Sequence, residues 1–182
     1  MTTEDYDVAA DADDFWVASD IGQQNGTTTL YFQYTNIAPA VWAEAFANLD
    51  TSAIPDDATI TAATVFWYMH ARHVSGFPRP PTHYYKVYIR PNAGGWTNFF
   101  TFGPGGTPAL GWTSHALTAG ELSKVNLTGM TSLKFDVPAP GSNQGREYYI
   151  RAREHATADT YDCYIRVTYT VPSGSVFTAI FG

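Results

Sequence analysis

One sharply punctuated corner constrains the fold of this chain more than any other feature. Residues 43–49 alternate between small apolar side chains and larger or polar ones, which is the period-two pattern of a strand. Pro55 then fixes its own φ angle and pushes Ile54 towards extended backbone, so residues 54–57 predict a turn. Residues 60–70 are rich in β-branched and aromatic side chains and predict a second strand. We expect Ile54 and Ile60 to insert between two sheets at this corner.

The corner and its flanks resemble a known family. The run from Ser52 to Val65 reads SAIPDDATITAATV and is similar to a signature of jelly-roll domains called DNRLRE-type or carbohydrate-binding-module-like. Residues 11–34 resemble the opening of that family, with an Asn-Gly turn between two strands, and residues 148–171 resemble its closing strands. The resemblance implies an all-β fold, a single antiparallel two-sheet jelly-roll β-sandwich. It implies much less about function, because this scaffold hosts many activities.

Strand patterns recur along the chain with turn signals between them. About nine strands at this spacing predict a two-sheet antiparallel sandwich. One short helix is expected at 119–124, because Thr118 can cap it and Glu121 can complete a capping box. We expect an N-terminal arm at 1–10, the sandwich at 11–171 and an apolar tail at 172–182. The predicted strands are 15–18, 27–34, 42–49, 60–70, 84–90, 112–117, 132–137, 148–153 and 161–171.

Composition and charge exclude several classes of partner. The net charge is −7 and only 10 residues are Lys or Arg, so nucleic acid and anionic membranes are poor partners. The acidic N-terminal residues carry no basic leader followed by an apolar stretch, and no apolar run is long enough to cross a bilayer. We therefore expect assembly in the cytoplasm without a signal peptide. The single cysteine, Cys163, shares strand parity with Ile165 and Val167 and is expected to be buried and inert.

Two apolar features predict contacts beyond a simple core. In the strand at 64–69, Val65 and Trp67 share one face while Phe66 and Tyr68 share the other, so both faces are apolar. The second face is covered either by a neighbouring loop or terminal segment, or by another subunit. After a Ser/Gly spacer, residues 176–181 are also too apolar to stay solvated and must pack on their own sandwich or on a partner. The residues expected to dock subunits are Val176, Phe177, Ile180, Phe181, Phe66 and Tyr68.

Catalytic and metal-binding signals are weak. The carboxylates of Glu44, Asp50, Glu147 and Glu154 have ordinary surface interpretations as well as a glycosidase-type one. Asp11, Asp13 and Asp14 are weak calcium candidates, because they lack the Gly and the distal Glu of a calcium loop. We expect a protein that is not an enzyme and has no catalytic residues, cofactor or metal.

Two functions remain open. The first is a non-enzymatic structural protein of a virion surface, such as a bacteriophage capsid decoration, head-fibre or tail-associated protein, binding itself and the major capsid protein. The second is a carbohydrate-binding module that stacks surface glycans on exposed aromatic rings. The stacking candidates are Trp67, Trp96, Trp112, Tyr84 and Tyr85.

Overall fold

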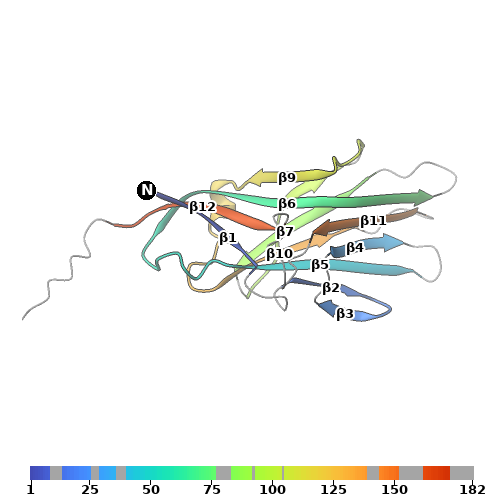
Figure 1. Ribbon diagram of the computed structural model, residues 1–182, viewed down its shortest axis with the longest axis horizontal. Helices are drawn as coiled ribbons and strands as arrows, with labels where there is room; N and C mark the ends of the chain where they lie inside the picture. The colour runs from blue at the N-terminus through green and yellow to red at the C-terminus, as the bar shows by residue number, and fades with distance from the viewer. Residues whose placement is uncertain are drawn as a thin grey trace, which may run out of the picture.

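The computed structural model describes residues 1–8, 14–25, 29–35, 40–76, 83–91, 93–103, 105–138, 144–151 and 162–172 (Figure 1). This part of the chain is nearly all β-structure, with antiparallel strands and one short helix, which confirms the all-β prediction. The elements are β1 (Thr2–Asp7), β2 (Asp14–Ala18), β3 (Gly22–Asn25), β4 (Thr29–Thr35), β5 (Val41–Asp50), β6 (Thr59–Gly76), β7 (Tyr85–Pro91), β8 (Thr97–Phe102), β9 (Gly111–Ala116), α1 (Ala119–Leu122), β10 (Met130–Asp136), β11 (Gln144–Arg151) and β12 (Tyr164–Thr170).

The strands form one hydrogen-bonded sheet organised around the long strand β6. The main path runs β1-β12-β6-β11-β4-β5-β10-β7-β8, and β2, β3 and β9 branch from it. Strands β12 and β11 follow one another along one edge of β6. Strand β9 pairs with the opposite edge, because Phe66 faces Tyr164 of β12 on one side and Ser114 of β9 on the other. β6 runs along the long axis of the molecule (Figure 1).

The sheet curls so that strands distant in its order share one core. The ring centroid of Trp67 on β6 lies 5.1 Å from the ring centroid of Phe100 on β8 and 6.1 Å from that of Phe135 on β10. Every second residue of β5, from Ala43 to Leu49, is buried on the same inner surface. This enclosed layer of aromatic and aliphatic side chains is the main source of hydrophobic stabilisation.

The predicted corner between β5 and β6 consists of two consecutive turns. The amide of Ile54 donates to the carbonyl of Thr51 at 3.2 Å, and the amide of Ala58 donates to the carbonyl of Pro55 at 2.9 Å. Ile54 is buried in the core, as expected. Ile60 is only partly buried and packs against the core at its margin, so it is less enclosed than expected.

A buried hydroxyl network ties this corner to the loop before β10. The Thr51 hydroxyl lies 2.6 Å from the Asn126 carbonyl, 2.8 Å from the Gly129 carbonyl and 2.9 Å from the Thr131 hydroxyl. The Thr131 hydroxyl oxygen in turn accepts a hydrogen bond from the backbone amide of Asn126 at 2.9 Å. Each hydroxyl supplies one proton, so Thr131 donates to Thr51 and Thr51 donates to a carbonyl. The loop is therefore held by side chains as well as by backbone.

Replacing Thr51 by valine is expected to lower the free energy of unfolding by about 1–3 kcal/mol, because it leaves buried carbonyl and hydroxyl groups without a partner. Thr61 is the matched control, since its hydroxyl also bonds a carbonyl, that of Thr168 at 3.1 Å, but in an exposed position. Thr61→Val should change stability by less than about 0.5 kcal/mol. Urea denaturation of both variants provides the comparison, and equal effects would contradict a structural role for the Thr51 network.

Three strands were not predicted, and others differ in length. The expected N-terminal arm contains β1, which pairs in register with β12, so treating this whole segment as an arm is wrong. The acidic side chains of β1 do not form the apolar alternation that predicts a strand, although charged residues are common on the edge strands of sheets. Strands β3 and β8 were also missed, β6 continues to Gly76, and β11 begins at Gln144. The expected helix is confirmed in its first residues, with the Thr118 amide donating to the Glu121 carboxylate at 2.7 Å.

Candidate functional site

Four aromatic side chains lie together on the outer surface of the curled sheet. Tyr164 of β12 is directly opposite Phe66 of β6, and Tyr68 of β6 is opposite Trp112 of β9. Directly opposed residues of antiparallel strands point to the same face. The neighbours of Phe66, Val65 and Trp67, are buried in the core, so these four rings point outwards. We call this group, Phe66, Tyr68, Trp112 and Tyr164, the aromatic face.

The rings of the aromatic face contact one another across three strands. Phe66 and Tyr164 are stacked with 4.5 Å between ring centroids and 4° between planes. Trp112 meets Tyr68 and Tyr164 edge-on, with 5.6 Å between centroids in each case. Such pairs stabilise by about 0.5–1.5 kcal/mol beyond their area burial. The sequence left open what covers the second apolar face of β6, and these lateral contacts shield part of it, while Trp112 remains 44% exposed.

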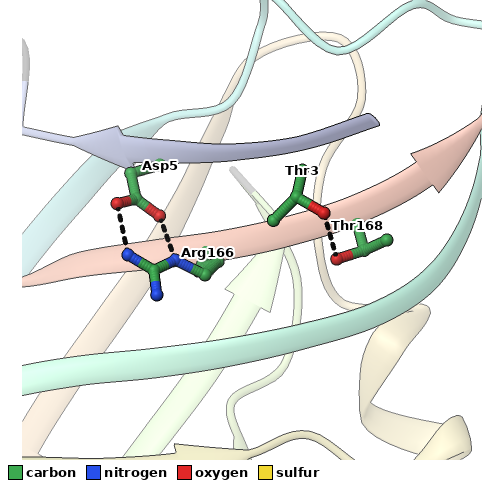
Figure 2. A network of polar contacts seen from close by, with 4 residues as sticks. All are labelled: Thr3, Asp5, Arg166 and Thr168. Atoms are coloured by element: carbon green, nitrogen blue, oxygen red, sulfur yellow. Dashed lines mark hydrogen bonds and ion pairs between the residues drawn. The ribbon is translucent and has the colours of Figure 1, made fainter. Parts of the chain in front are cut away.

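A ladder of polar side chains lies beside the aromatic face. Figure 2 shows the Asp5 carboxylate of β1 accepting two hydrogen bonds from Arg166 of β12, at 2.7 and 2.8 Å. Two residues further along each of these strands, the hydroxyls of Thr3 and Thr168 lie 3.0 Å apart. The Arg166 guanidinium carbon is 5.5 Å from the Phe66 ring centroid and 5.9 Å from that of Tyr164. Arg166 therefore joins the polar ladder to the aromatic face.

The electrostatics keep these groups in defined protonation states. The two hydrogen bonds and the charge of Asp5 raise the pKa of Arg166 above its usual value, so the guanidinium stays charged. Partial burial raises the pKa of the Tyr164 phenol, with the Asp5 charge adding to the effect and the Arg166 charge opposing it. Tyr164 therefore stays protonated at neutral pH. The arrangement offers apolar rings, hydroxyls and one ion pair on a sheet surface.

Only one of the five predicted stacking residues belongs to the aromatic face. Trp112 is exposed as expected. Trp67 and Tyr85 are core residues, so their assignment to an exposed platform is wrong. Tyr84 is partly buried, and its amide donates to the buried Tyr148 hydroxyl at 2.9 Å.

Trp96 lies in a different cluster. The Arg90 guanidinium carbon is 4.2 Å from its ring centroid, and the ring of Phe46 lies at 6.0 Å. Its ring is therefore stacked under a cation of its own chain and is not an open platform.

Among the described residues, the other sequence candidates lie in separate surroundings. Glu44 pairs with Lys134 at 2.8 Å, and the Asp50 carboxylate accepts from the Ser52 amide and hydroxyl, which lowers the pKa of Asp50. Cys163 is buried, as expected, and burial raises the pKa of its thiol. Asp14 is buried at the start of β2. Residues Asp11, Asp13, Glu154, Val176, Phe177, Ile180 and Phe181 lie outside the described residues.

The described ranges contain no cluster of three or more His, Cys, Asp or Glu side chains placed to hold a metal ion. No helix within them is long and apolar enough to span a membrane.

Comparison with known proteins adds no family. No protein-family model matches the sequence, and the search of curated proteins found no match. The resemblance to DNRLRE-type jelly-roll domains therefore stays a prediction.

Proposed function

We propose that this chain is a non-enzymatic binding domain, a jelly-roll β-sandwich that binds glycans through its aromatic face. The observation that carries this proposal is the exposed indole of Trp112 at the margin of four clustered rings. The core contacts of Trp67 with β8 and β10 support the sandwich, because they join strands distant in the sheet order.

The chemistry of the face matches that of a sugar. A pyranose ring has an apolar face of C–H groups that packs on an exposed aromatic ring, and a rim of hydroxyls that needs hydrogen-bond partners. The stacked Phe66 and Tyr164 hold the centre of the face rigid. Arg166, Thr3 and Thr168 provide donors and acceptors beside the rings, and Figure 2 shows the third guanidinium nitrogen of Arg166 pointing away from Asp5. Rigid aromatic groups lose little conformational entropy on binding.

A second candidate role is that of a structural protein on a virion surface, bound to other subunits such as the major capsid protein. It is favoured by the position of Phe66 and Tyr68, two of the six expected docking residues, on the same outward face. The two roles are compatible, since a virion protein can also bind surface glycans. Self-association or co-purification with a particle supports the second role, while binding of glycans by a monomer supports the first.

Replacing Trp112 by alanine is expected to weaken glycan binding by about tenfold or more, which corresponds to about 1.4 kcal/mol. The wild-type chain is first screened on a glycan array, and the affinity of the strongest ligand is then measured by titration calorimetry. Trp42→Ala is the matched control, because Trp42 on β5 is 43% exposed but lies outside the aromatic face. No ligand on the array, or equal losses in both variants, would refute the proposal.

A further inference from the structure

An apolar hollow opens at the end of the sheet where the corner meets the helix. Its volume is about 480 Å³, and it is lined by Ala58, Ile60, Ala119, Leu122, Ser123, Val125 and Leu127. Six of these seven side chains are apolar, and Ile60, Leu122 and Leu127 also pack against the core. An apolar side chain that fills a hollow with this lining removes apolar surface from water, which stabilises the folded protein.

The end of β12 lies beside this hollow. Thr170, the last residue of β12, pairs with Thr59, which stands between the lining residues Ala58 and Ile60. The next residue, Val171, is also an exposed apolar side chain. β12 therefore ends at the margin of the hollow.

The sequence after β12 has the composition of an occupant. Ser173, Gly174 and Ser175 form a short spacer that permits a change of direction, and the apolar residues Val176, Phe177, Ile180 and Phe181 follow it. From Thr170 to Val176 the chain can span at most roughly 20 Å, at about 3.3–3.6 Å per residue. The hollow begins at the strand position next to Thr170, so it is within this reach.

We propose that the segment 176–181 docks into the hollow of its own chain and closes this end of the core. The sequence left two possibilities for the segment, its own sandwich or a partner, and the position of the hollow favours the first. A short tether gives the segment a high effective concentration at its own hollow, which binding to a second molecule has to overcome. The net charge of −7 adds repulsion between copies. This inference is independent of glycan binding.

A disulfide test in the full-length chain distinguishes the possible occupants. Leu122→Cys and Phe177→Cys are introduced together, and oxidation is followed by non-reducing electrophoresis and peptide mass mapping. We expect most molecules to form an intramolecular disulfide and remain monomeric. The control pair combines Phe177→Cys with Leu110→Cys. Leu110 is exposed and precedes Gly111, which pairs with Met69, roughly 30 Å from Ile60 along β6 at about 3.3 Å per residue.

Two results would overturn the proposal. A disulfide between two molecules of the Leu122→Cys and Phe177→Cys variant would place the segment in the hollow of a second copy. Cross-linking no stronger than in the control pair would mean that the segment does not occupy the hollow.

Hydrogen exchange provides a test that does not depend on the cysteine variants. In the unmodified chain, at least one amide within 176–181 should exchange tenfold or more slowly than an unstructured peptide of the same sequence. Leu127→Asp, inside the hollow, should abolish this protection, and Thr128→Asp, an exposed neighbour, should preserve it. Absence of protection in the unmodified chain, or equal effects of the two substitutions, would contradict docking.

Discussion

Replacing Trp67 by alanine is expected to lower the free energy of unfolding by about 3–5 kcal/mol. Trp67 is 0% exposed, and its indole bridges β6 to Phe100 of β8 and Phe135 of β10. Alanine would leave a cavity at the point where strands distant in the sheet order meet, and the surrounding rings can relax only partly. Since small domains are stable by about 5–15 kcal/mol, this single change removes a large share of the total. Urea denaturation followed by circular dichroism measures the effect.

Trp112→Ala is the control for this prediction, because it removes the same side chain from the outer surface of the neighbouring strand β9. It should cost no more than about 1.5 kcal/mol, the upper range for a lost aromatic pair. Equal destabilisation by the two substitutions would mean that the inner and outer faces of β6 are assigned wrongly.

The local features of the fold were predictable from the sequence, because they depend on neighbouring residues. Alternation in β5 identified Ala43, Ala45 and Ala47 as one face, and all three are buried. The turn at Pro55 follows from the restricted φ angle of proline and of the residue before it. The capping interaction between Thr118 and Glu121 depends on a spacing of three residues.

Strand pairing was less predictable, because it depends on residues far apart in the chain. Asp5 and Arg166, which form the ion pair between β1 and β12, are 161 positions apart. The sequence of β1 has only one buried side chain, Tyr6, so it lacks the apolar alternation that marks a strand. Its partner strand, rather than its own composition, makes it part of the sheet.

The candidate site was predictable only in part, because residue type alone does not say which face of a strand a side chain occupies. Trp67 and Tyr85 are aromatic, but each alternates with outward neighbours and faces the core. Strand alternation also identifies the residues that the sequence analysis missed. Cys163 and Ile165 are buried, so Tyr164, between them, and Arg166, which follows Ile165, point outwards. Asp5, Thr3 and Thr168 required the β1–β12 pairing as well.

Ile54→Asp is expected to prevent soluble folding. The Ile54 side chain is 1% exposed and belongs to the core at the turn between β5 and β6. A carboxylate there has to be buried without a partner or protonated, and either outcome costs several kcal/mol, about the whole stability of a small domain. The measurement is the yield of soluble protein, followed by thermal denaturation of any that is recovered.

Ile60→Asp separates the burial of Ile54 from a general intolerance of charge at this corner. Ile60 is only partly buried and lines the open hollow beside α1, so an aspartate there can reach water. It should lower the melting midpoint yet still give folded protein, whereas the position between two sheets expected from the sequence would make this substitution prevent folding. Soluble Ile54→Asp protein with an unchanged melting midpoint would mean that the corner does not anchor the core. Equal loss of soluble protein in both variants would instead place Ile60 as deep in the core as Ile54.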